Sequence, residues 1–200
     1  MSKFISSSIG SKFLVSISGL FLILFLIVHL SINALLMFSA DLFNEAAHFM
    51  VTNPAIKIME PVLALGFIVH IFYATYVTLR NQSKRPVKYS KKDDKANSTW
   101  ASQNMFVLGG LIFVFLVIHV INFFWQLRFG HVDSTIVNGV EMHDTFTLVN
   151  DLFINWWWYD VIYIAGAVLL GFHLSHGFWS AFQSIGWSGK TWRKRFEVLG

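Results

Sequence analysis

Long apolar stretches alternate with short polar ones along the whole chain. Four stretches, at residues 13–36, 56–79, 105–127 and 158–182, contain very few charged side chains. A helix of about 20 apolar residues is long enough to cross a lipid bilayer, and each stretch exceeds that length. We therefore predict an all-α membrane bundle with four transmembrane helices, which together form one domain over residues 1–200.

The composition agrees with a membrane protein. Hydrophobic residues make up 55% of the 200 residues, and the mean hydropathy is +0.57. The first apolar stretch is longer than the ~7–15 residues of a signal-peptide core and has no small-residue cleavage pattern after it, so we expect a retained helix. Because the chain has no cysteine, it cannot form disulfides, bind iron–sulfur clusters through thiolates or attach haem covalently.

Charge is distributed unevenly between the connecting segments. The N-terminus, the segment between the second and third stretches and the C-terminal segment hold 13 of the 15 basic residues: Lys3, Lys12, Arg80, Lys84, Arg85, Lys88, Lys91, Lys92, Lys95, Lys190, Arg193, Lys194 and Arg195. The other connections hold most of the acids. By the positive-inside rule, these three basic segments face the cytoplasm. The net charge of +4 then suits a membrane surface or a soluble partner better than nucleic acid.

The two connections predicted to face outward have features of their own. Residues 39–51 begin with a capping serine and end before Asn53-Pro54, which predicts a short interfacial helix. Residues 130–155 form a polar connection. The run from Trp156 to Tyr159 predicts an aromatic belt where the fourth helix enters the membrane.

Each apolar stretch carries one histidine far from its ends, and histidine at membrane depth usually has a function. His29 and His119 lie roughly 10–12 Å from the outer edge, whereas His70 and His173 lie roughly 14 Å from the inner edge. Two pairs at two depths are what two haems with two histidine ligands each require, since one neutral imidazole binds the iron from each side. Such irons have no open position and carry electrons.

Other interpretations of these histidines remain open. A membrane histidine can bond a backbone carbonyl or serve a proton relay. His176 competes with His173, although it lies one turn nearer the cytoplasm. His48, His131 and His143 fall in the predicted outer segments, where we expect them to be solvated.

Small residues accompany the histidines at helical spacing. Gly66 lies four residues before His70, and the fourth stretch has Gly166, Gly177 and Ala181 on the face of His173. Gly109 and Gly110 interrupt the third stretch. These residues would leave space for a haem, and the alternative is that they bring helices into contact.

Three segments carry a resemblance to a known family: residues 18–33 (SGLFLILFLIVHLSIN), 115–119 (FLVIH) and 171–182 (GFHLSHGFWSAF). The chain resembles, over nearly its whole length, the cytochrome b membrane anchor of succinate:quinone oxidoreductases and fumarate reductases. The resemblance is to the single-anchor, two-haem type of Bacteroidetes-like bacteria. The family's haem ligands match His29, His70, His119 and His173. The family has a fifth transmembrane helix, and this chain stops at FEVLG, so we expect a shorter variant or a truncated sequence.

The resemblance implies two b-type haems in a multi-pass protein of the bacterial cytoplasmic membrane. It also implies a flavoprotein subunit and an iron–sulfur subunit on the cytoplasmic face, and a quinone, usually menaquinone. The anchor itself would do no succinate or fumarate chemistry. Two other classes remain: a cytochrome b of the hydrogenase or formate dehydrogenase type, and a haem-free transporter or proton channel.

Further candidate residues lie at the predicted membrane edges. Arg80, at the inner edge, is a candidate partner of a haem propionate. Glu60 is placed to exchange protons with a quinone near the outer haem, with Glu45 and His48 as further candidates. Alternatively, Glu60 with the following Pro61 simply begins the second helix.

Overall fold

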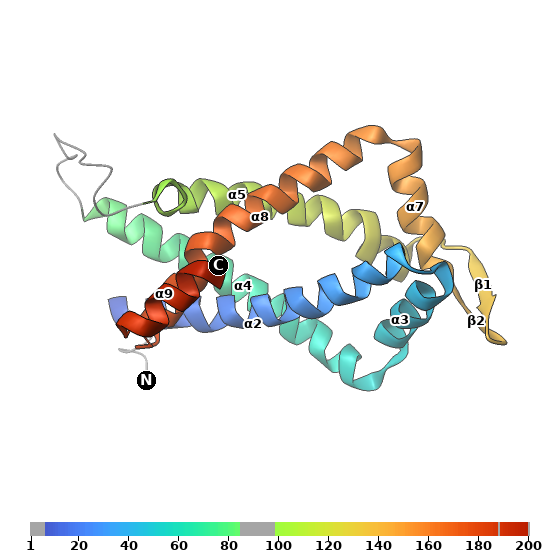
Figure 1. Ribbon diagram of the computed structural model, residues 1–200, viewed down its shortest axis with the longest axis horizontal. Coiled ribbons are helices and arrows are strands. Elements are labelled where there is room, and N and C mark those ends of the chain that lie inside the picture. The colour runs from blue at the N-terminus through green and yellow to red at the C-terminus, as the bar shows by residue number, and fades with distance from the viewer. Residues whose placement is uncertain (1–6, 85–98, 188, 200) are drawn as a thin grey trace. The chain divides into compact units, whose positions relative to one another are not determined.

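The computed structural model describes residues 7–84, 99–187 and 189–199, and its regular structure is almost entirely helical (Figure 1). The long helices are α2 (Ser8–Ala34), α4 (Pro54–Ser83), α5 (Trp100–His119) and α8 (Trp157–Ser184). Helix α2 continues into the 3-10 turn η1 (Leu35–Met37). Helix α5 continues through a π-helix, η2 (Val120–Trp125), into α6 (Gln126–Phe129). With these extensions the four spans are 28 to 30 residues long, enough to cross a membrane.

Large apolar side chains on these four helices point outward. Leu24 and Ile68 are each 63% exposed, and Ile164 is 65% exposed. A continuous apolar surface of this kind would be unfavourable in water, whereas acyl chains of a bilayer solvate it well. The prediction of an all-α membrane bundle with four spanning helices is confirmed.

The long helices begin earlier than the apolar pattern indicates, because polar residues cap them upstream. Ser7 Oγ accepts a hydrogen bond from the backbone N–H of Gly10 at 3.0 Å, and Asn53 Oδ1 accepts one from Ala55 at 2.9 Å. Asn53 followed by Pro54 is a favourable helix start. The interpretation that Glu60 and Pro61 begin this helix is therefore wrong. Both lie inside α4, where Pro61 removes one backbone donor.

The connections between spans contain further structure. The predicted short helix is present as α3 (Ala40–Thr52), with Ser39 as its N-cap. The connection expected only to be polar folds into β1 (Ser134–Val137), β2 (Val140–His143) and α7 (Thr145–Asn155). The strands are antiparallel, with Val137 opposite Val140. Asn138 and Gly139 turn the hairpin at φ values of 52° and 79°, as a tight turn of this kind requires.

Asn44 connects α3 to the start of α7 through hydrogen bonds. Its side chain is 2% exposed, its Nδ2 donates to Asp144 Oδ1 at 3.2 Å, and its Oδ1 accepts from the backbone N–H of Phe146 at 2.8 Å. Asp144 also caps α7 by accepting from the backbone N–H of Thr147 at 3.1 Å. Two elements far apart in sequence thus share one polar junction.

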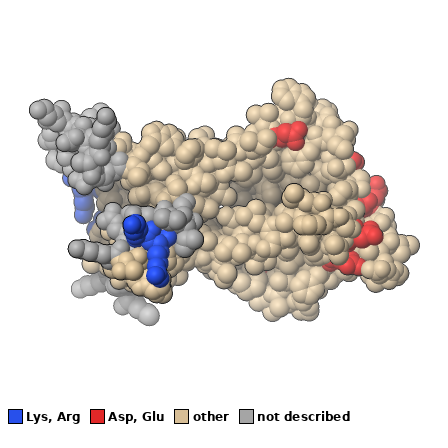
Figure 2. Space-filling view, viewed as in Figure 1, with Lys and Arg blue, Asp and Glu red and all other residues tan. Residues whose placement is uncertain are grey.

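The chain divides into two compact units. The His70 unit contains Met1–Ile23, Ala64–Ile112 and Val168–Gly200, and the His29 unit contains Leu24–Leu63 and Phe113–Ala167. Each spanning helix contributes part of its length to each unit. In Figure 2 the acidic side chains gather on the His29 unit, which holds Asp41, Glu45, Glu60, Asp133, Glu141, Asp144, Asp151 and Asp160.

Basic side chains in the same view lie on the His70 unit. Several of the basic residues used to predict orientation lie outside the described residues: Lys3, Arg85, Lys88, Lys91, Lys92 and Lys95. The side chains of Lys190 and Arg193 in α9 (Lys190–Leu199) are likewise not described. The N-terminal orientation of the chain stays a prediction.

Candidate functional site

The His70 unit brings two of the four predicted histidines together. The ring centroids of His70, from α4, and His173, from α8, are 6.3 Å apart, and the ring planes are inclined at 76°. The ring paired with His70 belongs to His173, which lies one turn before His176 on α8. The geometry therefore favours His173 over its competitor as the partner of His70.

Helix α2 holds the His70 ring in place. The Nδ1 atom of His70 lies 3.2 Å from the carbonyl oxygen of Val15 and 3.3 Å from Ser18 Oγ. Because a carbonyl oxygen only accepts hydrogen bonds, Nδ1 carries the proton that it donates. Nε2 of a neutral ring is then left with its lone pair, which is the form that binds a metal.

Gly19 provides the room for this arrangement. A Cβ atom at position 19 would lie 3.1 Å from Cε1 of His70, closer than side-chain carbons ordinarily approach. On the other side of the pair, a Cβ at Gly109 would lie 3.8 Å from Cε1 of His173, an ordinary contact. The α2 residues that contact His70, namely Val15, Ser18 and Gly19, were not predicted from the sequence. A serine and a glycine side by side in an apolar helix are the signal that could have found them.

The His29 unit brings the other two predicted histidines together. The ring centroids of His29, from α2, and His119, from the end of α5, are 5.5 Å apart at an interplanar angle of 81°. Phe25 stacks on His29 at 5.4 Å. The Asn33 amide donates to the His29 carbonyl oxygen at 2.8 Å, and the same nitrogen lies 3.4 Å from Nε2, which is long for a hydrogen bond.

Aromatic side chains enclose His119. Phe123 lies 5.3 Å from its ring centroid, and Phe115 and Tyr163 each lie 5.9 Å from it. Tyr163 accepts a hydrogen bond through its hydroxyl oxygen from Asn122 Nδ2 at 3.2 Å. The π-helix η2 starts at the residue after His119 and carries Asn122, and π segments often occur at functional sites.

Comparison with known proteins gives one informative match. The chain is 27% identical over 158 residues to the succinate dehydrogenase cytochrome b558 subunit of Bacillus subtilis (strain 168). The match covers 78% of this chain and 69% of that protein. No family model matches the chain, and no solved structure does. The similarity supports the family resemblance described from the sequence.

Both histidine pairs fit a haem between their rings. Two imidazoles that bind one metal from opposite sides have ring centroids roughly 6 Å apart, since each metal–nitrogen bond is about 2 Å long. The separation of 6.3 Å has this size, and the separation of 5.5 Å is slightly shorter. Within the described ranges no group of three or more His, Cys, Asp or Glu side chains is arranged to bind a bare metal ion. Haem needs only two protein ligands, because the macrocycle supplies four nitrogens.

Two of the paired rings differ from His70 in their Nδ1 atoms. Nδ1 of His119 and Nδ1 of His173 are buried without a hydrogen-bond partner among the described residues. Leaving a buried polar atom unpaired costs about 1–3 kcal/mol. Binding of a metal through Nε2 would leave Nδ1 as it is, so these two rings lack the hydrogen bond that orients His70.

Not every glycine serves the histidines. A Cβ at Gly66 would lie 2.8 Å from the Phe21 ring, and one at Gly166 would lie 2.5 Å from the Phe115 ring. These two glycines let helices approach each other closely, so the helix-packing interpretation applies to them. A Cβ at Gly177 would make only an ordinary contact, 3.8 Å from Met105.

Two of the three predicted quinone-site residues engage partners, and the two partners differ. Glu60 forms an ion pair with Arg128, whose guanidinium also lies 5.9 Å from the centroid of the Phe124 ring. Glu45 accepts a hydrogen bond from the side chain of Asn138 at the hairpin turn. His48 lies half-buried on α3. The partnership of Glu60 with Arg128 was not predicted.

Arg80 lies in the last turn of α4, in the His70 unit. Its guanidinium carbon is 5.9 Å from the centroid of the Tyr76 ring, and the side chain of Ser83 donates to its backbone carbonyl at 3.0 Å. Tyr76 therefore orients the cation that was predicted to meet a propionate.

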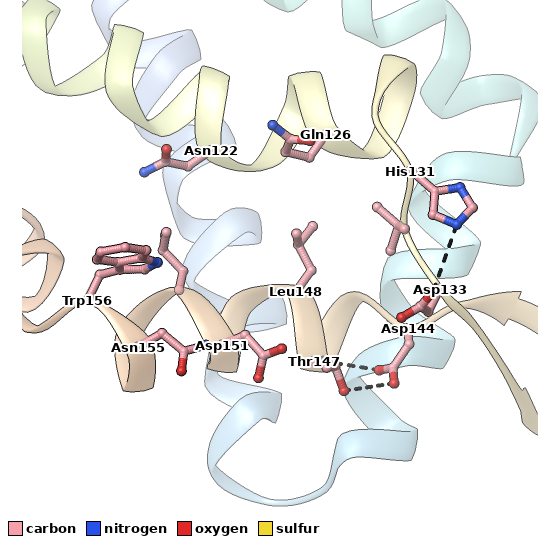
Figure 3. A pocket seen from close by; sticks show the side chains of 12 residues that line it. Asn122, Gln126, His131, Asp133, Asp144, Thr147, Leu148, Asp151, Asn155 and Trp156 are labelled. Atoms are coloured by element: carbon pink, nitrogen blue, oxygen red, sulfur yellow. Dashed lines mark hydrogen bonds and ion pairs between the residues drawn. The ribbon is translucent and has the colours of Figure 1, made fainter.

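The His29 unit also has a polar cavity that the sequence did not indicate (Figure 3). It has a volume of about 380 Å³, and its walls include Asn122, Gln126, Asp144, Asp151, Asn155 and Trp156. Amide and carboxylate side chains share its walls with apolar ones, among them Leu148 and Leu152. Asn122 belongs both to this wall and to the aromatic surroundings of His119, so the cavity adjoins the residues that enclose that histidine.

Proposed function

We propose that the chain is the membrane anchor and cytochrome b subunit of a succinate dehydrogenase or fumarate reductase complex. The similarity to a succinate dehydrogenase cytochrome b558 subunit supports the family. The observation that carries the proposal is the pairing of four membrane histidines, two in each compact unit. We further propose that residues 1–200 act as one domain that binds two b-type haems.

His29 and His119 would hold the outer haem iron, and His70 and His173 the inner one. When bound, the haems accept and donate single electrons, and with both axial positions filled they offer no open site to oxygen. The Val15 carbonyl holds His70 in the tautomer that keeps Nε2 available for iron. The apolar helices around each pair exclude water, and Arg80 at the inner edge would bind a propionate.

In this proposal, the inner haem receives electrons from an iron–sulfur subunit, which together with a flavoprotein subunit docks on the cytoplasmic face. The outer side would serve a quinone in the bilayer, which for the two-haem type is usually menaquinone. Glu60 would exchange the quinone's protons, and its ion pair with Arg128 would hold the side chain in place between turnovers. Glu45 and His48 on α3 are the further candidates for this proton exchange.

Co-purification of the protein from its native bacterial membrane tests the function. We expect a flavin-containing and an iron–sulfur-containing subunit in the complex, with two haems b per complex. Identification of a hydrogenase or formate dehydrogenase partner would favour the other cytochrome b class. A purified complex without any haem spectrum would overturn the proposal.

A further inference from the structure

The rings of His70 and His119 are held by different means. Nδ1 of His70 donates to the Val15 carbonyl, which fixes the rotation of that ring. Nδ1 of His119 is buried without a hydrogen-bond partner among the described residues. Because no hydrogen bond through Nδ1 sets the rotation of His119, the neighbouring side chains must set it by packing.

Tyr163 is at the centre of that packing. Its ring contacts His119 at 5.9 Å and also the two phenylalanines that flank His119, with centroid distances of 5.2 Å to Phe115 and 5.8 Å to Phe123. The ring of Phe153, from α7, also contacts the Tyr163 ring, with the centroids 5.1 Å apart. Tyr163 therefore joins three helices around one histidine ring.

A hydrogen bond fixes Tyr163 in turn. Asn122 Nδ2 donates to the hydroxyl oxygen of Tyr163 at 3.2 Å. Asn122 lies in the π-helix that begins directly after His119, so the donor and the histidine are on the same continuous backbone. Asn122 therefore links the backbone that follows His119 to Tyr163, and the Tyr163 ring in turn contacts the His119 ring.

We infer that Tyr163 and Asn122 are positioning residues that set the ring plane of His119 as a ligand of the outer haem. Tyr163 acts through ring contact, and Asn122 acts by keeping Tyr163 in place. Neither residue binds iron. The inference rests on the proposed function, because it needs a haem held by His29 and His119.

The angle between two axial imidazole planes governs the electron paramagnetic resonance signal of an oxidised bis-histidine haem, so that signal is the main readout. Tyr163→Leu removes the ring, Tyr163→Phe keeps the ring without the hydroxyl, and Asn122→Leu removes the donor. Tyr159→Phe is the matched control, since Tyr159 lies on the same helix and its ring centroid is 6.5 Å from that of Tyr163. All variants are measured in the intact complex, with haem content and redox titration alongside.

We expect Tyr163→Leu to shift the signal and midpoint potential of the outer haem while the inner haem keeps its own. Tyr163→Phe should restore most of the wild-type signal, and Asn122→Leu should produce a smaller shift than Tyr163→Leu. Unchanged outer-haem signals in Tyr163→Leu and Asn122→Leu, with both haems bound, would overturn the inference. If Tyr163→Leu loses the outer haem, its signal cannot be measured, and the other two variants test the inference. Outer-haem signals of Asn122→Leu and Tyr163→Phe that both equal the signal of Tyr159→Phe would contradict the inference.

Different results would contradict the proposed function and the positioning role of Tyr163. A wild-type complex that lacks two bis-histidine signals contradicts the proposed function and, with it, the role of Tyr163. A wild-type complex that shows both signals, together with Tyr163 variants that leave them unchanged, contradicts only the positioning role.

Discussion

The Nδ1–H of His70 donates to the carbonyl oxygen of Val15, one helix away, at 3.2 Å. Val15 is in α2 and four residues before Gly19, which leaves the space that the ring occupies. The first spanning helix thus orients a histidine of the second. The pair of His70 and His173 therefore depends on three helices, although only two of them supply its histidines.

Substitution of the paired histidines should remove haems selectively. We expect His29→Ala or His119→Ala to remove mainly the outer haem, and His70→Ala or His173→Ala to remove mainly the inner one, since each haem needs both axial ligands. Haem content and redox-titrated spectra measure the outcome. His176→Ala is the control and should keep both haems. Retention of both haems in His173→Ala would instead assign His176 as the ligand.

A side chain at position 19 should disturb the inner pair only. Gly19→Val places methyl groups where the His70 ring lies, and overpacking of this kind costs about 1–3 kcal/mol, so inner-haem content should fall at least about twofold. Gly171→Val is the control, because a Cβ at Gly171 meets no atom within 4 Å. Equal haem content in the two variants would show that the space at Gly19 is unimportant.

Much of this arrangement follows from the sequence, and the rest depends on contacts that a pattern cannot reveal. The four spans and the short helix after Ser39 were predicted because apolar runs and capping residues act locally. The start of α4 was misjudged because Glu60-Pro61 resembles a helix start, whereas Asn53 with Pro54 begins the helix.

The pairing of histidines could be expected from depth, since rise along a helix is fixed. The orientation of their rings could not, because it is set by residues on other helices. Tyr163 lies 44 positions from His119 in the sequence, and no spacing rule connects them. The hairpin was missed although Asn138-Gly139 is a strong turn signal.

Neutralising Glu60 should separate a role in quinone chemistry from a structural role. We expect Glu60→Gln to abolish quinone-coupled turnover, because the amide cannot exchange protons, while haem content and the flavoprotein's reaction with artificial acceptors persist. Arg128→Gln breaks the same ion pair but keeps the carboxyl group, so it should retain much more turnover. Equal losses in both variants would indicate that the ion pair serves only the structure.

Removal of the Arg80 charge should change the inner haem. A positive charge beside the propionates favours the reduced iron, so Arg80→Gln should lower the midpoint potential of the inner haem and leave the outer one unchanged. Lys57→Gln, an exposed cation on the same helix but in the other unit, is the control. An unaltered inner potential in Arg80→Gln would exclude the pairing with a propionate.

Asp144 should make the α7 junction sensitive to acid. Burial alone would raise its pKa, but hydrogen bonds from the backbone and hydroxyl of Thr147 and from Asn44 outweigh burial and lower the pKa below its ordinary value of 3.8. Because the folded pKa is depressed, this stabilisation is present above pH 3.8 and is lost as the pH falls through the folded pKa.

Asp144→Ala removes the helix cap, which should cost about 0.5–2 kcal/mol and increase hydrogen exchange in α7. Asp151→Ala, an exposed acid within α7, is the control and should have little effect. The difference in exchange between Asp144→Ala and the wild type should shrink below about pH 4. A difference that persists undiminished at lower pH would mean that the carboxylate charge does not contribute.

The Asn44 junction has a consequence for the order in which the protein is made. Its partners Asp144 and Phe146 lie 100 and 102 positions further along the chain. While the ribosome is still producing the second and third spans, the partners of the Asn44 amide have not yet been synthesised. The junction therefore closes only after the segment before the fourth span has been synthesised, which makes it a marker of late folding.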